Sequence, residues 1–490
     1  MLKKSSVALA LSLALSGYTS AAEDPIVDSK TDLGTLRPGN GGYSSAMGVS
    51  ADGKVVVGAS STDSGSWNAF VWREGDTKMT GLGTLKADNS GNSWAYGVSA
   101  DGKVVVGASS TDSGDYNAFV WREGDTKMTG LGTLKADNSG YSFARGVSAD
   151  GTVVVGESRT DSGDYNAFVW REGDTKMTGL GTLKADNSGN SWAYGVSADG
   201  KVVVGASSTD SGFENAFVWR EGDTKMTGLG TLKADNSGYS NAWGVSADGK
   251  VVVGRAETDS GDHNAFVWRE GDTKMTGLGT LKADNSGNSF ARGVSADGTV
   301  VVGESRTDSG DYNAFVWREG DTKMTGLGTL KADNSGDSFA WGVSADGTVV
   351  VGSSVTDEGN LHATVWKVKY PVPPVEPPVT PPVEPPVTPP VEPPVVTIVD
   401  ATNSSKAMAD TGRRGFKVLD LYQSSLNSLS QSRCQLGQSD YCVGVFSQYD
   451  TVSSNHRLAT GLFGAIRLPA ENWTVGGAMN FANGTQLIDN

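Results

Sequence analysis

The stretch LGTLKADNSGNSWAYGVSADGKVVVGASSTDSGDYNAFVWREGDTKMTG, residues 82–130, returns along the chain with a fixed period of 49 residues. Its GVSAD motif begins at Gly48, Gly97, Gly146, Gly195, Gly244, Gly293 and Gly342. Units of this size, repeated without insertions, indicate a solenoid, a propeller or a similar repeat array. The fold of the chain therefore depends on what one unit forms.

One unit contains four short runs rich in Val, Thr and aromatic residues. The runs are SWAYGVS, VVVGASS, NAFVW and KMTGLGTL, and the turn-forming segments ADGK, TDSGD, REGD and KADNSG follow them in that order. This composition is typical of strands joined by tight turns. Each unit is predicted to be a four-stranded antiparallel meander, so the array is predicted to be an all-β, seven-bladed β-propeller. A β-solenoid with two coils per unit is the alternative.

The two ends of the array complement each other. The last unit ends with HATVWKV, residues 362–368, and lacks a fourth run. The segment TDLGTL, residues 31–36, matches that missing fourth run but precedes the first unit. An open array would leave sheet edges uncovered. We therefore expect the N-terminal segment to complete the last blade and close the ring.

Regions outside the array suggest export and a second domain. Residues 1–22 combine Lys3 and Lys4 with a short apolar run and small residues, as in a secretory signal peptide, so the propeller is predicted to span residues 23–370. Residues 371–396 are predicted to be an extended Pro-rich linker. The net charge of −16 argues against nucleic acid as a partner.

Residues 397–490 show a different pattern. Residues 408–429 have helical spacing, and three strand-like segments follow: YCVGVFSQYDTV, HRLATGLFGAIRLP and WTVGGAMNFANGT. Cys434 and Cys442 flank a Gly-containing turn, and in an exported protein they are predicted to form a local disulfide.

The motif pattern LGTL, GVSADG, VVVG and NAFVW, over residues 33–366, resembles the HAF-type extracellular repeat of exported bacterial proteins. The helix and strands behind a linker resemble the C-terminal domain of an autotransporter, whose barrel inserts into the outer membrane. This resemblance implies a passenger at the cell surface, in the outer membrane or released. A barrel of about 12 strands needs more residues than follow Tyr441, so residues 397–490 are interpreted as an incomplete barrel domain.

The array contains few residues of the types that act in nucleophilic catalysis. It contains two histidines, His263 and His362, and no cysteine, so the chain is predicted not to be an enzyme and to need no cofactor or metal. The DNSG and TDSG loops are interpreted as Asx turns rather than calcium sites, and the REGDTK charges as a solvated hairpin tip.

Variation between units points to a candidate ligand-binding face. It gathers before GVS and in the loop after VVVG, for example at Asp115–Tyr116 and Asp262–His263, and these two places are expected to open on one face. The candidate residues are Trp94, Tyr96, Phe143, Arg145, Trp192, Tyr194, Trp243, Phe290, Arg292, Phe339 and Trp341. Binding surfaces favour Trp, Tyr and Arg. Packing between blades and sequence drift are the alternatives.

The two arginines at these positions each have a candidate partner. Arg145 occurs with Glu157, and Arg292 with Glu304, as cross-strand ion pairs would. Together the patterns predict an exported, adhesin-like passenger that binds an extracellular glycan or protein surface. A structural display stalk without a ligand is one alternative, and a propeller glycosidase is a less favoured one.

Overall fold

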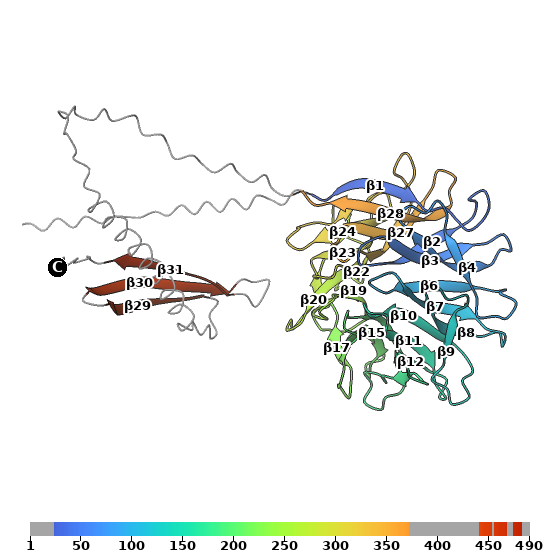
Figure 1. Cartoon of the computed structure of the whole chain (residues 1–490), viewed down its shortest axis with the longest axis horizontal. Coiled ribbons are helices and arrows are strands. Elements are labelled where there is room, and N and C mark those ends of the chain that lie inside the picture. The colour runs from blue at the N-terminus through green and yellow to red at the C-terminus, as the bar shows by residue number, and fades with distance from the viewer. Residues whose placement is uncertain (1–23, 372–440, 453–454, 468–473, 483–490) are drawn as a thin grey trace, which may run out of the picture. The chain divides into compact units, whose positions relative to one another are not determined.

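The computed structural model describes residues 24–371, 441–452, 455–467 and 474–482. The chain divides into two compact units, Met1–Pro377 and Pro378–Asn490. In the first unit, seven four-stranded antiparallel sheets are arranged radially (Figure 1). The predicted all-β, seven-bladed propeller is therefore confirmed, and the solenoid alternative is wrong.

Each blade begins with an inner strand and continues with a second strand next to it. The inner strands are β2 (Ser44–Val49), β6 (Ser93–Val98), β10 (Ser142–Val147), β14 (Ser191–Val196), β18 (Ser240–Val245), β22 (Ser289–Val294) and β26 (Ser338–Val343). The second strands are β3 (Val55–Ser61), β7 (Val104–Ser110), β11 (Val153–Arg159), β15 (Val202–Ser208), β19 (Val251–Glu257), β23 (Val300–Arg306) and β27 (Val349–Val355).

The third strands are β4 (Trp67–Arg73), β8 (Tyr116–Arg122), β12 (Tyr165–Arg171), β16 (Glu214–Arg220), β20 (His263–Arg269), β24 (Tyr312–Arg318) and β28 (Leu361–Lys369). The outer strands are β5 (Thr80–Gly83), β9 (Thr129–Gly132), β13 (Thr178–Gly179), β17 (Thr227–Gly230), β21 (Thr276–Gly277) and β25 (Thr325–Gly326), with β1 (Ile26–Asp32) in the last blade. Blades 1 to 6 follow chain order from β2, and blade 7 is β26, β27, β28 and β1.

The outer strands are short because a fixed turn ends each of them. In blade 1, Gly83 has φ 75° and Asn89 has φ 58°, both in the left-handed region. The Thr84 N–H donates to the Asn89 side-chain oxygen at 2.8 Å. Glycine and asparagine tolerate this conformation better than other residues. The repeated Gly and Asn of LGTLKADN therefore end the strand and turn the chain towards the next blade.

The core lies between neighbouring sheets. Phe119 of β8 is fully buried together with Val57 and Val71 of the preceding blade, and equivalent clusters recur around the ring. Gly107, opposite Phe119 in the sheet, has no room for a side chain, because an added Cβ would lie 1.9 Å from the Trp94 carbonyl oxygen. The motif VVVG thus supplies both the buried valines and the gap that this packing needs.

A ring of backbone hydrogen bonds joins all seven SADG turns. The Ala51 N–H donates to the Ala100 carbonyl, and this pattern continues around the ring at 3.0 Å until the Ala345 N–H donates to the Ala51 carbonyl. The final bond links the last blade to the first. Each turn therefore depends on both of its neighbours.

Strand β1 closes the propeller, as expected from the sequence. It pairs antiparallel with β28 from Ile26 opposite Lys369 to Asp32 opposite Thr364. The strand begins upstream of TDLGTL, and only its end overlaps that motif. The Leu33 N–H continues the ladder by donating to the Ala363 carbonyl at 2.9 Å. The closure is thus more extensive than the repeat motif alone indicates.

Side chains reinforce this seam. His362 Nδ1 lies 2.9 Å from an Asp32 carboxylate oxygen, and the Lys369 ammonium lies 2.6 Å from Asp28. Trp366 is fully buried in a cluster that Val27 of β1 helps to cover. In the other six blades the equivalent tryptophan is partly exposed and its indole N–H donates to the carbonyl of the REGD turn, as Trp72 does to Asp76. Burial under β1 therefore sets the last blade apart.

In the second unit, the described residues form one three-stranded antiparallel sheet with the order β29 (Tyr441–Val452), β30 (Asn455–Arg467) and β31 (Thr474–Ala482). The three predicted strands are confirmed. The predicted signal peptide, Pro-rich linker and helix over residues 408–429 lie outside the described residues. Within the described ranges, no helix is long and apolar enough to cross a membrane.

Candidate functional site

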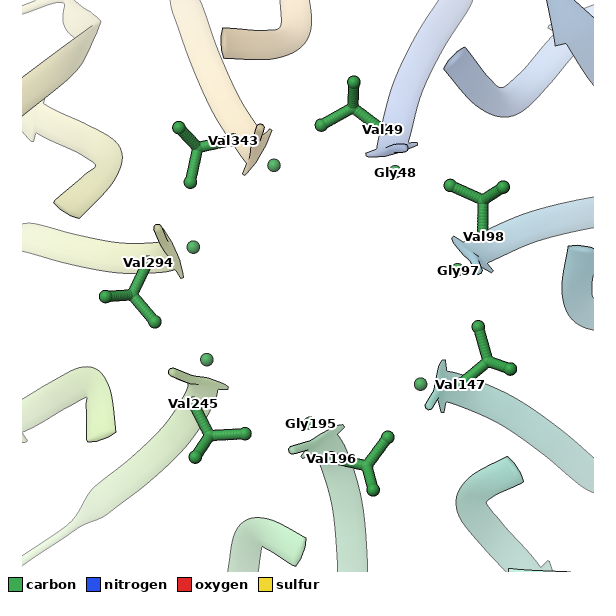
Figure 2. Close-up of a pocket in the computed structure, with 14 residues that line it drawn as sticks. Gly48, Val49, Gly97, Val98, Val147, Gly195, Val196, Val245, Val294 and Val343 are labelled. Carbon is green, nitrogen blue, oxygen red and sulfur yellow. The ribbon is translucent and has the colours of Figure 1, made fainter. Parts of the chain in front are cut away.

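The seven inner strands line a central channel with a volume of about 200 Å³. Its wall consists of one Gly–Val pair from each blade, such as Gly48–Val49 and Gly97–Val98, and Figure 2 shows these pairs around an open centre. Glycine suits this position because an added Cβ at Gly97 would lie 3.2 Å from the carbonyl oxygen of Arg145 in the next blade, a tight contact. The wall therefore has the same pair of residues in every blade.

Directly before each channel glycine, the inner strand carries a side chain that differs from blade to blade. We call these residues the mouth ring: Met47, Tyr96, Arg145, Tyr194, Trp243, Arg292 and Trp341. Two residues earlier on the same strands lies the second ring: Ser45, Trp94, Phe143, Trp192, Asn241, Phe290 and Phe339. All the predicted ligand-binding residues belong to these two rings, and each of them is partly exposed.

Hydrogen bonds between loops place both rings at one face of the propeller. The Ala87 N–H, in the loop before β6, donates to the carboxylate of Asp112, in the loop after β7, at 3.1 Å. At the opposite end of the strands, the Glu123 N–H of the REGD turn donates to the Lys103 carbonyl of the ADGK turn at 2.8 Å. The prediction that these pairs of loops open on opposite faces is confirmed. We call them the mouth face and the closing face.

Each inner strand has a bulge at its mouth-ring residue. In β6, pairing with β7 shifts between Ala95 and Gly97, so Tyr96 lies at a bulge, and every other inner strand shows the same shift. A bulge bends the strand and redirects its side chain. The mouth-ring residue therefore lies outside the regular strand pairing. Blades carry Met, Tyr, Arg or Trp at this position, and the hydrogen-bonded pairing of the residues on either side stays the same.

Arg145 connects two blades and a buried carboxylate. Its Nε and one terminal nitrogen donate to Glu157 at 3.0 and 2.6 Å. Its guanidinium carbon lies 4.4 Å from the ring centre of Tyr96 in the preceding blade and 5.2 Å from that of Phe143. The side chain of Glu157 is 4% exposed and that of Arg145 is 28% exposed. The predicted pair is confirmed, and its outer surface remains open at the mouth.

Arg292 makes the corresponding pair with Glu304, at 2.6 Å, in blade 6. Its guanidinium lies between the mouth-ring residues of both neighbouring blades, 3.9 Å from the Trp243 ring centre and 4.7 Å from that of Trp341. A chain of aromatic contacts connects the same two tryptophans through Phe290, Tyr312 and Phe339, with ring centres 6.0 to 6.3 Å apart. Blades 5 to 7 thus form a continuous aromatic surface that includes the Arg292 guanidinium.

Burial and charge determine the ionisation of these groups. Burial raises the pKa of Glu157, and the Arg145 guanidinium opposes this shift. Burial lowers the pKa of Arg145, but Glu157 and Tyr96 together outweigh it and leave the arginine pKa raised. Burial also raises the pKa of Glu304, against the effect of Arg292. Each bidentate pair holds its guanidinium plane in place, as a stacking surface requires.

The closing face is built differently. Arg73 pairs with Glu123 of the next blade at 2.6 Å, and the same contact recurs at Arg122, Arg171, Arg220 and Arg269. Lys367 of the last blade pairs with Glu74 of the first at 2.8 Å. The REGDTK tip is solvent-exposed, as interpreted from the sequence, but its Arg and Glu also join neighbouring blades. Sequence reasoning missed these pairs, although the recurrence of Arg and Glu at a 50-residue separation was the available signal.

Other predicted features have mixed outcomes. The DNSG loops are Asx turns, since the Ser90 N–H donates to the Asp88 carboxylate at 2.9 Å, and its equivalents do the same. In the part of the chain that the structure describes, no cluster of three or more His, Cys, Asp or Glu side chains is placed to hold a metal. Cys434 lies outside the described residues, so its disulfide with Cys442 stays a prediction.

No protein-family model and no curated protein matches the chain. Among solved structures, it is similar to TolB from Acinetobacter baumannii, with 11% identity, a TM-score of 0.37, and coverage of 55% of this chain and 66% of that one. It is also similar to the β-propeller domain of the Trilobed protease from Pyrococcus furiosus, with 12% identity, a TM-score of 0.43, and coverage of 68% and 99%. These values indicate likeness of fold alone.

The comparisons correct two predictions. The resemblance to autotransporters and to the HAF-type repeat is wrong, because the similar structures are TolB and peptidase propellers and no family model supports it. The prediction that the chain is not an enzyme is also corrected: the solved structures similar to it include a puromycin-hydrolyzing peptidase and a putative 6-phosphogluconolactonase. The autotransporter barrel expected over residues 397–490 has no support in the three-stranded sheet described there.

Proposed function

We propose that the chain is a carbohydrate-binding propeller whose binding surface is the mouth face. The observation that carries this proposal is the contrast within each blade: strands, turns and core repeat almost unchanged, while the mouth ring and second ring vary. The variable residues are mainly Trp, Tyr, Phe and Arg, and they remain partly exposed. Ring closure and core packing do not require this variation, so a ligand is the better explanation for it.

The chemistry of the mouth face suits a sugar. Exposed aromatic faces stack on the apolar C–H faces of pyranose rings, and Trp, Tyr and Arg contribute much of the free energy at binding sites. Here Arg145 and Arg292 are held flat by buried glutamates and stacked on Tyr96 and Trp243. The rings and guanidinium planes therefore need little reordering when a ligand binds, which lowers the entropic cost of association.

Two similar surfaces occur three blades apart. One centres on Arg145 in blade 3, and the other on Arg292 in blade 6; both units carry the sequence SFARGVSADGTVVVGESRTDSGDYNAFVW. Two sites on one rigid ring can engage two units of one polymer or one glycan-covered surface, and this raises the effective affinity without new contacts. The proposed role is thus attachment to a repetitive glycan, and the signal-like residues 1–22 support a location outside the cytoplasm.

A glycan array probed with the full chain tests the proposal. The variant Trp94→Ser/Tyr96→Met gives blade 2 the residues of blade 1, where Ser45 and Met47 occupy these positions. The same exchange in blade 4 is Trp192→Ser/Tyr194→Met. Because blade 1 already folds with these side chains, we expect the four-substitution variant to keep its melting temperature within a few degrees and to lose roughly ten-fold or more in glycan affinity.

Lys103→Ala provides the matched control, since Lys103 is 62% exposed on the closing face. It should bind as the unchanged protein does. Undiminished glycan binding by the four-substitution variant would reject the surface around Arg145, in blades 2 to 4, as a glycan site. Binding to proteins but to no glycan on the array would favour a protein surface as the ligand, and binding to neither would leave a display scaffold as the better account.

A further inference from the structure

Blade 5 differs from the other blades at neighbouring positions of the mouth face. It carries Asn241 in the second ring, where most blades have an aromatic residue, and Arg255 on β19 opposite it in the sheet. The positions equivalent to Arg255 are Ala59, Ala108, Glu157, Ala206, Glu304 and Ser353. Arg255 is therefore the one basic residue in this set.

The contacts of Arg255 differ from those of the two mouth-ring arginines, Arg145 and Arg292. Its Nε donates to the side-chain oxygen of Asn241 at 2.9 Å. Among the residues that the structure describes, no carboxylate pairs with it, whereas Arg145 and Arg292 each hold a buried glutamate in a bidentate contact. The terminal N–H groups of Arg255 thus keep their capacity to bind an anion.

Aromatic rings lie beside this guanidinium. Its central carbon is 5.3 Å from the Trp243 ring centre and 5.4 Å from that of Phe290. Arg292 stacks on the same two rings, at 3.9 and 5.5 Å. Two guanidinium groups therefore share one aromatic surface, and only one of them has a carboxylate partner.

Neighbouring charges do not neutralise the site. Burial and the positive charge of Arg292 lower the pKa of Arg255, and Tyr194, Glu304 and Glu214 oppose this shift only in part. Burial lowers the pKa of His263, and Arg255 adds to that effect, so the imidazole carries no charge at neutral pH. Glu214 is the nearby free carboxyl, and burial raises its pKa. A bound carboxylate would relieve the remaining positive potential.

We propose that Arg255 binds the carboxylate of an acidic sugar whose ring stacks on Trp243 and Phe290. This inference rests on the proposed carbohydrate-binding function and assigns its ligand class for blades 5 and 6. A planar guanidinium fork with two free N–H groups matches a carboxylate in a bidentate geometry. The net charge of −16 opposes densely charged polyanions, so a sugar with a single carboxylate suits the site better. The blade 3 surface lacks an equivalent of Arg255, because the preceding blade carries Ala108 at that position, and we expect it to prefer an uncharged sugar.

Two substitutions of the full chain test the assignment by calorimetry. Arg255→Ala introduces the residue that blades 1, 2 and 4 carry at this position, so the blade should fold. Lys250→Ala removes the same charge from an exposed residue of the closing face. The probes are methyl glucuronide and methyl galacturonide, with methyl glucoside and methyl galactoside as their uncharged counterparts.

We expect Arg255→Ala to weaken uronide binding by roughly 10- to 100-fold, the range for a charge-assisted hydrogen-bonded pair. Binding of the uncharged glycosides should not change, and Lys250→Ala should leave all four affinities unaltered. Equal affinity of Arg255→Ala and the unchanged protein for the uronides would overturn the inference while leaving the proposed function intact. Tighter binding of glucose 6-phosphate than of the glucuronide would overturn the carboxylate assignment. Failure of both uronides to bind the unchanged protein would also overturn the inference, whereas the glycan array decides the proposed function separately.

Discussion

The two faces of the propeller are built from the same strands but are under different constraints. On the closing face, the Ala51–Ala100 hydrogen bond and its equivalents form an unbroken ring, and the Arg73–Glu123 type of ion pair joins neighbouring blades. On the mouth face, Met47, Tyr96 and Arg145 occupy equivalent positions on identical backbone bulges. We infer from this difference that ring closure constrains the residues of the closing face. The residues of the mouth face can vary, and they can therefore form a binding surface.

Removing the closing strand tests the constraint on the ring and should give the largest effect. Deletion of residues 24–33 would expose the edge of β28 together with Trp366 and Val368, which are 0% and 2% exposed in the closed ring. Burial of two large apolar side chains stabilises a fold by roughly 3–6 kcal/mol, and the unpaired edge adds to the loss. Thermal unfolding should therefore begin far lower or lose its cooperativity.

Deletion of ten residues from the Pro-rich segment, 373–382, is the length-matched control for that experiment and should leave the melting temperature unchanged. If both deletions melt at the temperature of the full chain, β1 contributes nothing to closure and the proposed constraint on the ring fails.

A buried ion pair on the mouth face should give the next largest effect. Glu157→Ala leaves the partly buried Arg145 without its partner, and breaking such a pair costs about 3–5 kcal/mol. The double variant Glu157→Ala/Arg145→Tyr gives blade 3 the residues of blade 2, Ala108 and Tyr96, and should recover to within about 1 kcal/mol. Urea denaturation measures both. A double variant as unstable as the single one would show that mouth-face residues are not exchangeable between blades.

On the closing face, the ion pairs are exposed and should matter less individually. Arg122→Ala removes a contact in which both side chains are about a third or more exposed, and such pairs contribute about 0–1 kcal/mol. The same denaturation experiment should register a change within that range. A loss of several kcal/mol would mean that the closing face depends on these charges rather than on its backbone ring.

The pH dependence of stability should show the smallest effect. Burial, aided by Arg255, lowers the pKa of His263 below its ordinary value of 6.5. Between the folded and unfolded pKa values, the unfolded chain binds more protons, so stability falls as the pH drops below 6.5. His263→Tyr, the residue at this position in blades 2, 3 and 6, should reduce the fall in melting temperature between pH 7 and pH 5. An identical fall in both proteins would remove His263 as its source.

The sequence predicted the features that recur in every unit and the one feature that the last unit lacks. The 49-residue period with four turn signals predicted the blades, and the unmatched TDLGTL segment predicted closure by β1. The covariation of Arg145 with Glu157 predicted their pairing because both lie within one blade. These inferences needed only local strand geometry.

Contacts between blades were harder to predict. The stacking of Arg292 on Trp243 and Trp341 depends on how three inner strands converge at the channel, which periodicity alone does not specify. The mouth-ring residues lie at a bulge on the inner strands, and the sequence did not predict that bulge. The autotransporter interpretation was wrong because strand-like alternation in residues 441–482 is equally consistent with a small sheet.

The most direct test of the binding proposal is a crystal structure of the propeller, residues 24–371, with the best glycan from the array. The account predicts sugar density on the mouth face, stacked on the rings beside Arg145 or Arg292, and no change on the closing face. A glycan bound instead at the ADGK and REGD turns, or at the outer strands, would contradict the claim that variation between blades marks the binding surface.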